Sequence, residues 1–459
     1  MRKRKLMALA LGCMMACSLV ACGTKTDTTT TDDQTADATD DAKDDTTTDD
    51  ATTDDAATDD AAGGETTDIT LWTYPIGSWG DSATVDGLLA NFNEAHPEIH
   101  VTVEYLDYTN GDDQINTAIE GNQAPDIVLE GPERLVANWG AKGLMVDLAD
   151  LWTDDAKSSI YESVEKACKG NDGVYYEYPL CMTAHTMAIN RDLFEAADAL
   201  QYLDEETGTW TTEGFQKAVQ AVYDNGQQTV GAVYCNGQGG DQGTRALVNN
   251  LYGGTFTNAD HTEYTVSSDE NVKALELLKS MDGINFDASI VGGDEINMFC
   301  NGTFAMAFCW NVAQEKNNKD NISFDVLPMA FPSDSGFPQL CGGIWGFGIF
   351  NNGDDAKIAA AKTFIDFMAN DEKQVVESVK ASSYWPVKDI GNIYSDDELM
   401  TEYSKFVGYM GDYYQVVGGW AEARTAWWNM LQQVGSGEDV KTAVDEFQAT
   451  ANAAAAAAQ

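Results

Sequence analysis

The chain has 459 residues, a net charge of −49 and 11 tryptophans. Phosphate backbones and anionic lipids repel so acidic a protein, which excludes nucleic acid and acidic membrane surfaces as partners of its folded part. Only four histidines occur, at positions 96, 100, 185 and 261, and no Cys-x-x-Cys pair is present. We therefore expect neither a transition-metal centre nor a cofactor.

The first residues have the pattern of an export signal. Four basic residues, Arg2–Lys5, precede an apolar run from Leu6 to Ala21. A helix of that length spans about 24 Å, which is less than the roughly 30 Å hydrocarbon core of a bilayer. A basic flank, a short apolar core and small residues at its end are typical of a signal peptide, which we predict for residues 1–21.

The end of this segment, Leu19-Val20-Ala21-Cys22-Gly23, resembles the bacterial lipobox, whose cysteine is acylated and becomes the mature N-terminus. The resemblance implies lipidation at Cys22. The protein would then be lipid-anchored at the extracellular face of the cell membrane, with the lipid as its only contact with that membrane. The alternative is an ordinary secretory signal that contains an incidental cysteine.

Residues 22–67 form a segment of low complexity rich in Thr, Asp and Ala. From Thr24 to Thr67 it holds 14 Asp and one Glu against two Lys. Such a segment has almost no apolar surface to bury and its charges repel one another, so we predict a disordered tether. Recognition of a basic partner is the alternative role for such a run of charge.

The body begins with strands and helices in alternation. Strands are predicted at Asp68–Tyr74, Ile99–Leu106 and Ala124–Leu129, with helices between them from Ser82 onward and over Asp113–Gly121. This alternation indicates a largely parallel, doubly wound sheet. Ligands of such sheets bind at the carboxyl ends of the strands.

The rest of the body is predicted to mix helices and strands without a repeat. Helices are predicted at 133–143, 192–200, 212–225, 271–281, 356–369, 425–434 and 439–451. Strands are predicted at 174–189, 303–310, 322–327 and 342–350. Roughly 390 residues from position 68 onward are enough for two lobes of ordinary size.

Six cysteines lie in the body, at Cys168, Cys181, Cys235, Cys300, Cys309 and Cys341. An even number in an exported protein permits disulfides, and six cysteines allow fifteen complete pairings. Buried free thiols agree equally well with the sequence, so both alternatives stay open.

Five motifs follow one another along the body. They are Asn91–Ile99, Ala124–Val128, Gly143–Leu148, Val174–Leu180 with Ile189–Phe194, and Met298–Met306. In this order they resemble the motifs of the extracellular solute-binding proteins of sugar ABC transporters, the maltose-binding-protein-like family. The first is similar to the family's F-N-x-x-x-P-x-I-x-V link and the last to its F-x-x-G-x-x-A-M signature. The resemblance covers the chain from Asp68 to the C-terminus.

The resemblance implies an α/β fold of two lobes joined by hinge segments, the type II form of the periplasmic-binding-protein fold. It implies a first lobe of residues 68–180 and 329–373, and a second lobe of residues 181–328 and 374–459. Hinges are expected near Tyr178–Thr183, Leu327–Met329 and Asp371–Val375. Closure of the lobes around a ligand would change a shape that a transporter recognises.

Two segments resemble ligand-binding stretches of the family. Trp420-Ala421-Glu422-Ala423-Arg424 is similar to a stretch with a sugar-stacking tryptophan and an arginine four residues later, which implies binding by Trp420 and Arg424. Trp310 closely follows Ala305-Met306, where the family has another stacking tryptophan. The Gly-Pro that usually precedes that tryptophan is missing here.

Seven further candidates stand at strand ends, in glycine-rich turns or at the crossover between lobes. Sugar sites combine flat aromatic rings with charged and amide groups that bind hydroxyls. These candidates are Trp72, Tyr74, Glu130, Tyr178, His185, Trp345 and Trp385. By contrast, helical patterns predict packing roles for Trp139, Trp152, Trp427 and Trp428.

The resemblance implies a monomeric protein that captures a sugar or oligosaccharide and delivers it to an ABC permease. One alternative is the same fold with a polyamine, peptide or other small solute as ligand. The other is a surface polysaccharide-degrading enzyme, but no spacing among Asp112, Asp113 and Glu130 singles out an acid and a base. No nucleophile elbow, phosphate loop or dinucleotide fingerprint occurs, so we expect no catalytic residues.

Overall fold

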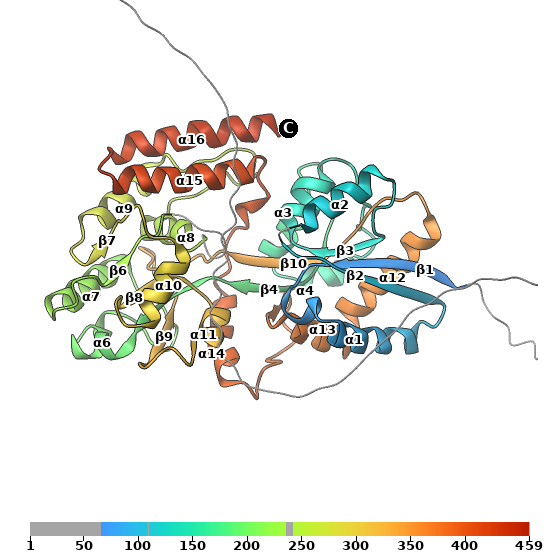
Figure 1. The fold of residues 1–459 in the computed structure, drawn as a ribbon, viewed down its shortest axis with the longest axis horizontal. Coiled ribbons are helices and arrows are strands. Elements are labelled where there is room, and N and C mark those ends of the chain that lie inside the picture. Colours follow the sequence, from blue (N-terminus) through green and yellow to red (C-terminus); the bar gives the residue numbers. More distant parts are fainter. Residues whose placement is uncertain (1–65, 109, 236–241, 459) are drawn as a thin grey trace, which may run out of the picture. The chain divides into compact units, whose positions relative to one another are not determined.

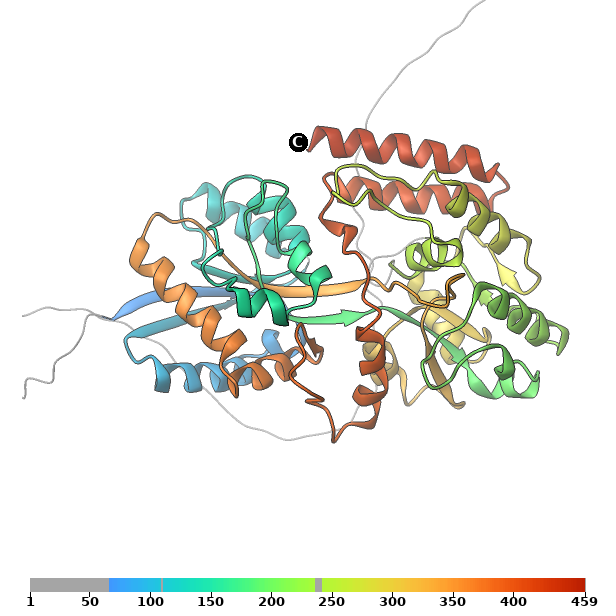
Figure 2. The same cartoon turned by 180° about the vertical axis from the view of Figure 1, so that it is seen from behind.

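The computed structural model describes residues 66–108, 110–235 and 242–458. The predicted signal peptide, Cys22 and all but the last two residues of the predicted tether lie outside these ranges. The body is an α/β structure of two lobes, each built around its own sheet (Figures 1 and 2). Within the described ranges, no helix combines the length and apolar character needed to cross a membrane.

The first lobe is built on a six-stranded sheet with the order β11-β4-β10-β3-β1-β2. Its strands are β1 (Thr67–Thr73), β2 (Ile99–Tyr105), β3 (Ile127–Glu130), β4 (Tyr178–Ala184), β10 (Gly342–Ile349) and β11 (Trp385–Pro386). β1 runs parallel to β2 and β3, but β10 runs antiparallel to β3 and β4. The predicted largely parallel sheet is therefore wrong beyond β3, because the later strands do not arrive through strand–helix–strand crossovers.

Helices cover the first sheet. They are η1 (Gly77–Gly80), α1 (Ser82–Ala95), α2 (Gly111–Glu120), α3 (Pro132–Arg134), η2 (Leu135–Gly140), α4 (Asp154–Ser159), α5 (Glu162–Ala167), α12 (Asp355–Asn370) and α13 (Gln374–Ser382). α12 packs against β1, and α13 packs against η1 and β4. The single regular helix predicted at 133–143 is wrong, because one α-helical turn is followed by a π-helix. Such departures are frequent at functional sites.

The start of α1 shows how local sequence sets these elements. The side chain of Asp81 accepts a hydrogen bond from the N–H of Thr84 at 3.0 Å, which caps the helix. The helix buries the apolar positions that predicted it, Val85, Leu88, Leu89 and Phe92. The prediction of a helix from Ser82 is confirmed.

The second lobe contains the antiparallel sheet β8-β5-β9 and the short pair β6-β7. These strands are β5 (Thr186–Asn190), β6 (Gly231–Ala232), β7 (Ile284–Asn285), β8 (Met306–Trp310) and β9 (Val326–Met329). The remaining helices are α6 (Arg191–Ala196), η3 (Leu200–Tyr202), α7 (Thr212–Asp224), α8 (Gln242–Tyr252), α9 (Asp269–Ser280), α10 (Gly292–Cys300), α11 (Val312–Asn318), α14 (Glu398–Val407), η4 (Tyr414–Val416), α15 (Trp420–Gly435) and α16 (Val440–Ala457). α15 and α16 lie side by side (Figure 1).

Two predicted strands differ from the structure. The strand predicted at 174–189 is divided at His185, where the chain passes from β4 in the first sheet to β5 in the second. The strand predicted at 322–327 is wrong over its first four residues. β9 begins at Val326 opposite Asn190, the last residue of β5, so the preceding residues have no strand beside them.

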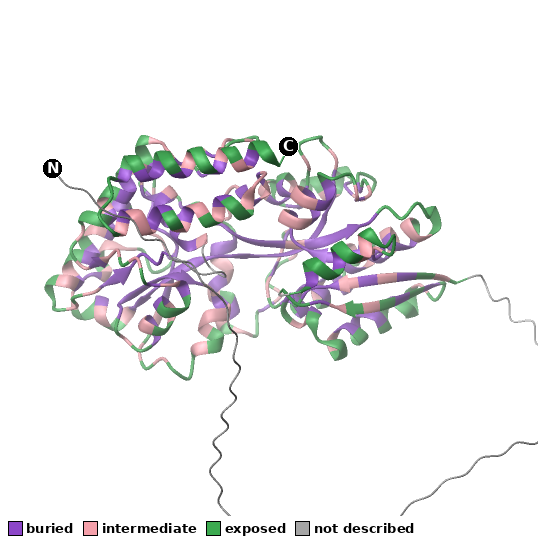
Figure 3. Ribbon diagram, turned by 45° about the horizontal axis from the view of Figure 1, so that its top comes forward, coloured by how far each residue is buried: buried purple, intermediate pink, exposed green. Residues whose placement is uncertain are grey.

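The strands that link the lobes are the most enclosed part of the fold. β4 is buried along its whole length, and β10 is buried except at Trp345 (Figure 3). All six cysteines of the body are buried as well. Cys168, Cys181, Cys235 and Cys300 are free thiols, and burial raises the pKa of the Cys181 thiol to about 12. Of the two alternatives left open by the sequence, the structure therefore has free thiols, not disulfides, at these four cysteines.

Candidate functional site

Aromatic and charged side chains gather at the carboxyl ends of β1 and β3. Tyr74 follows β1 and stacks on Tyr108, with ring centroids 5.2 Å apart. The guanidinium of Arg134 lies 5.2 Å from the Tyr74 ring and binds both oxygens of Asp112, at 2.8 and 3.2 Å. Together with Glu130, these residues form what we call the Arg134 cluster. Its place agrees with the expectation that ligand sites form at the carboxyl ends of strands.

Two carboxyl groups of the Arg134 cluster differ in their protonation. Glu130 is 1% exposed and accepts a hydrogen bond from Arg134 Nη1 at 2.9 Å. Burial raises the pKa of Glu130 to about 8, although Arg134 acts in the opposite direction. Burial also acts to raise the pKa of Asp112, but hydrogen bonds from Arg134 and Tyr74 hold it below its ordinary value. Asp112 thus stays ionised, while Glu130 titrates near neutral pH.

A further buried carboxyl group belongs to Glu177. Both of its carboxyl oxygens lack a hydrogen-bond partner among the described residues. Burial raises the pKa of Glu177 well above its ordinary range, and the charges of Glu133 and Glu130 add to the rise. A Cβ atom at Gly346 would lie 2.8 Å from Glu177 Oε1, so only glycine leaves room for this side chain. Burial and the neighbouring carboxylates thus both disfavour the charged form of Glu177.

A second pair of rings stands on the first lobe. Trp345 of β10 stacks on Tyr384, with ring centroids 4.6 Å apart and ring planes within 8° of parallel. Both residues are half-buried. A Cβ atom at Gly343 would lie 2.1 Å from the Trp345 ring, so glycine is needed there for the indole to lie along the strand. The pair forms a flat platform that suits the apolar face of a ring-shaped ligand.

In the second lobe, three aromatic side chains surround Arg245. This fully buried arginine lies 4.8 Å from the ring of Trp420, and the rings of Phe256 and Tyr414 lie at 5.6 and 5.9 Å. Arg245 Nε also donates a hydrogen bond to the Tyr414 hydroxyl at 3.3 Å. Cation–π contacts therefore hold Trp420, the first residue of α15, in position.

Tyr413 and Tyr414 connect the two sets of residues. The hydroxyl of Tyr413 donates a hydrogen bond to Glu133 Oε2 at 2.8 Å, one residue before Arg134. The next residue, Tyr414, contacts Arg245 in the second lobe. The segment Tyr413–Tyr414 thus hydrogen-bonds to Glu133, which precedes Arg134, and to Arg245, which contacts Trp420.

Trp310 and Tyr178 are predicted site residues that lie in the core, as do Tyr74 and Trp385. Trp310 is fully buried, donates a hydrogen bond from Nε1 to the Tyr403 hydroxyl at 2.7 Å and packs against Phe299. Tyr178 is also buried and donates a hydrogen bond to Asn370 Oδ1 at 3.0 Å. Neither ring presents a face to solvent in this structure. A ligand-binding role for either residue stays a prediction.

The other predicted residues are dispersed. Trp72 is half-buried within β1, opposite Val128. His185 lies at the crossover between β4 and β5, and Trp385 is buried at the start of β11. Arg424 lies one helical turn after Trp420. The binding roles of these residues also stay predictions.

All four tryptophans predicted to pack do so, three of them inside the core and Trp428 against it. Trp139, Trp152 and Trp427 are each at most 2% exposed, which confirms their place in the core. Trp428 is half-buried, and the guanidinium of Arg424 lies 5.8 Å from its ring. Trp428 therefore contacts one of the predicted site residues.

The sequence predictions did not include two arginines that are central to this geometry. Arg134 pairs with Glu130 four residues earlier, but Glu130 ends β3 and the two residues do not share a helix, so the helical ion-pair spacing was not a signal. Arg245 gave no local signal either, because its partners are more than ten residues away along the chain.

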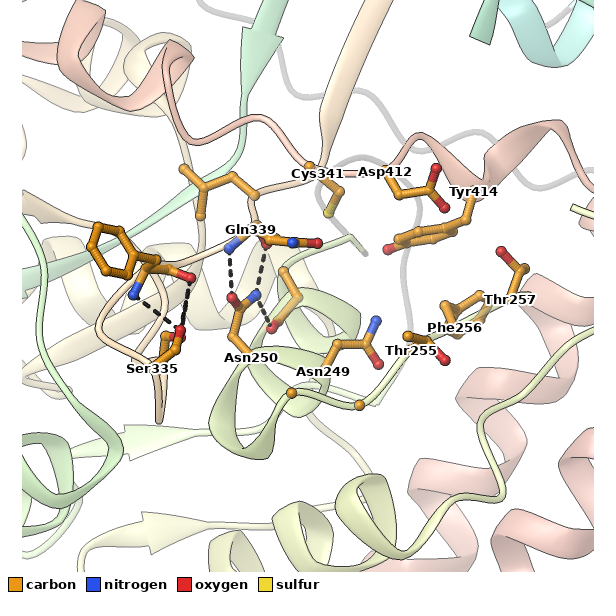
Figure 4. A pocket seen from close by; sticks show the side chains of 17 residues that line it. Asn249, Asn250, Thr255, Phe256, Thr257, Ser335, Gln339, Cys341, Asp412 and Tyr414 are labelled. Atoms are coloured by element: carbon orange, nitrogen blue, oxygen red, sulfur yellow. Dashed lines mark hydrogen bonds between the residues drawn. The ribbon is translucent and has the colours of Figure 1, made fainter. Parts of the chain in front are cut away.

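Two cavities lie apart from the Arg134 cluster and from the Trp345–Tyr384 pair. One, of about 290 Å³, is bounded by residues 136–141 and 169–176 of the first lobe and by 261–262, 416–418 and Ala458. The other, of about 240 Å³, lies in the second lobe (Figure 4). Neither contains a predicted site residue. Among the described His, Cys, Asp and Glu residues, no group of three or more is placed to hold a metal ion.

Comparison with known families decides the class of protein. Residues 77–375 match the family described as bacterial extracellular solute-binding protein. The chain belongs to this family. A search of curated proteins found no match for this solute-binding protein.

Solved structures show the fold of this solute-binding protein. The cyclic alpha-maltosyl-1,6-maltose binding protein from Arthrobacter globiformis is 18% identical with a TM-score of 0.69, over 85% of this chain and 99% of that one. The sugar-binding protein MalE from Xanthomonas citri is 16% identical with a TM-score of 0.70, over 85% and 98%. The GacH receptor of Streptomyces glaucescens, solved with acarbose, is 18% identical with a TM-score of 0.62, over 86% and 99%. The predicted two-lobed, maltose-binding-protein-like fold is confirmed.

Proposed function

We propose that this solute-binding protein captures a sugar or oligosaccharide between its lobes and delivers it to an ABC permease. The proposal is carried by the Trp345–Tyr384 platform on the same lobe as the Arg134 cluster. Sugars present apolar CH faces and a rim of hydroxyls, which flat rings and charged hydrogen-bonding groups bind respectively. Two of the similar structures are named for a cyclic maltose compound and for acarbose, which supports a carbohydrate ligand.

In this proposal the ligand also contacts the second lobe through Trp420 and Arg424, and the lobes close around it. The predicted lobe boundaries serve as the working division, with two adjustments. We place residues 330–341 with the second lobe, because Ala330 hydrogen-bonds to Gly208 and Gln339 to Asn250. We place residues 374–386 with the first lobe, because α13 packs on η1 and β4, and β11 extends the six-stranded sheet. Movement would then occur where the chain passes between lobes, near His185.

A cationic solute such as a polyamine is the second candidate. Three carboxyl groups, those of Glu130, Glu133 and Glu177, lie near one another, and only Arg134 offsets them within the cluster. Aromatic rings also bind cations through their faces. Burial, however, favours the neutral forms of Glu130 and Glu177, which weakens the attraction for a cation. We therefore favour the neutral sugar.

A thermal-shift screen tests the ligand class. A ligand at about 100 times its Kd stabilises the folded protein by about 2.7 kcal/mol, so a bound saccharide should raise Tm clearly. We expect such a shift with an oligosaccharide and none with spermidine or short peptides. A shift with a polyamine alone would overturn the carbohydrate assignment. We further propose binding without turnover, so mass spectrometry should recover the saccharide unchanged, and cleavage would contradict this.

We propose that the protein acts as a monomer held at the extracellular face of the membrane by a lipid on Cys22. The Cys22→Ala substitution should release the protein into the medium and impair uptake of its ligand, because the tether then has no anchor. Affinity for the ligand, measured on the purified protein, should be unchanged. Cell fractionation checks the release, and retention of the substituted protein on the membrane would contradict the anchor.

A further inference from the structure

The cavity of about 240 Å³ in the second lobe is separate from the proposed sugar site. Its walls come from residues 246–257, at the end of α8 and just beyond it, from residues 333–341 before β10, and from residues 411–414 (Figure 4). No residue of the Arg134 cluster and neither ring of the Trp345–Tyr384 platform lines it. A molecule bound here would therefore occupy a second site.

Hydrogen bonds fix the walls of this cavity. Asn250 pairs with the main chain of Gln339 through both ends of its amide, at 2.7 Å each (Figure 4). The N–H of Gly411 donates a hydrogen bond to the carbonyl of Leu340 at 2.8 Å. The three segments are thus bonded to one another, and the cavity is preformed, as small-molecule sites generally are.

Two polar side chains are directed into the cavity. Figure 4 shows the side chains of Asn249 and Tyr414 directed toward the same space. Both residues line the cavity. An amide and a phenolic hydroxyl can each hydrogen-bond to a molecule that carries hydroxyl groups.

The charges around the cavity exclude an ionic ligand. Its lining contains no Lys, Arg or Glu, so no group is present to attract an anion. The one acidic residue, Asp412, is bound by His261 at 2.8 Å and by Lys166 at 3.4 Å, so its charge is already compensated. The remaining polar lining consists of amides and hydroxyls. These groups favour a neutral ligand rich in hydroxyls.

An exposed aromatic ring stands among the lining residues. Phe337 is 79% exposed, although large apolar side chains are normally covered. Its ring can pack on the CH face of a cyclic polyol while the amides and hydroxyls bind the other edge. On the opposite wall, Phe256 and Tyr414 pack together with ring centroids 4.8 Å apart. The cavity therefore has apolar surface as well as polar groups.

We propose that this cavity is a second binding site, for a neutral cyclic polyol the size of a single sugar ring. Phe256 and Tyr414 each lie 5.9 Å from the ring of Trp420, so the wall of the second site is also the support of a predicted sugar-binding residue. The site has its own hydrogen-bonding groups and does not require the cleft to be occupied.

Calorimetric titrations with D-glucose and myo-inositol test the proposal, with glucuronate and glucosamine as charged controls of equal size. The titrations are carried out on the Arg134→Ala variant, in which ligand binding in the cleft is weakened. We expect saturable binding of a neutral probe, weakened about tenfold by adding Asn249→Leu, which removes the amide with little change of shape. Phe337→Ala should weaken it too, and this exposed position does not affect folding.

Three results would overturn the second site. The first is the absence of saturable binding by either neutral probe. The second is binding that neither Asn249→Leu nor Phe337→Ala weakens, which would place the molecule elsewhere. The third is equally tight binding of glucuronate or glucosamine, which would contradict the neutral chemistry of the lining. None of these results bears on oligosaccharide binding in the cleft, which is measured separately on the protein with intact Arg134.

Discussion

Trp310→Ala lowers the free energy of unfolding by about 3–5 kcal/mol, the range for removing a large buried aromatic side chain. The ring is fully buried, packs against Phe299 and donates a hydrogen bond to Tyr403. The Tyr403 hydroxyl in turn donates to Glu315 at 2.6 Å, so the substitution also removes one end of a buried network. Urea denaturation followed by circular dichroism measures the change.

Two variants make this result specific. Trp310→Phe keeps a ring but loses the hydrogen bond to Tyr403, so it should lower the free energy of unfolding by less than Trp310→Ala does. Trp428→Ala, at a half-buried position, should lower it by still less and serves as the control. The sequence resemblance assigns ligand stacking to Trp310. If Trp310→Ala kept its stability but lost ligand binding, that assignment would be right and the core role would be wrong.

Trp420→Ala weakens ligand binding by about 100-fold, the effect of removing a central aromatic contact. Its ring is half-buried and is held by Arg245 at 4.8 Å, so the indole is already ordered before a ligand arrives. Ordering a side chain in advance reduces the entropy lost on binding. Isothermal titration with the saccharide found in the thermal-shift screen measures the change.

A structural effect of Trp420→Ala must be separated from the loss of a contact. The substitution removes a cation–π partner of Arg245, which is worth about 0.5–2 kcal/mol, so Tm should fall only slightly. Trp420→Phe keeps an aromatic face and should recover most of the affinity. Asn429→Ala, at an exposed position further along α15, is the control and should bind normally. Unfolding of Trp420→Ala would instead place this residue in the core.

Much of the fold could be predicted because the motifs follow the family's order. The helix from Ser82 and the strand before it were visible in the spacing of apolar residues. The direction of the later strands could not be predicted, because the residues of a strand do not determine whether it runs parallel or antiparallel to its neighbour. The break at His185 was hidden for a similar reason, since β4 and β5 are both continuous apolar runs.

The candidate site was predictable only in part. Tyr74 and Glu130 were identified from their positions at strand ends, and the structure brings them together in the Arg134 cluster. Trp310 shows the limit of such reasoning, because its motif resembles a binding motif while its ring packs in the core. Arg245 and Tyr413 act through partners far away in the sequence, and no local pattern records such contacts.

Burial lowers the reactivity of the cysteine thiols toward oxidants. Oxidants attack the thiolate, and burial raises the pKa of Cys181 and Cys235 to about 12 and that of Cys300 to about 11. These sulfurs are therefore protected by folding rather than by a reducing compartment. A chain exported as proposed would lack that protection until it folds, so folding, rather than disulfide formation, would keep these cysteines from being oxidised.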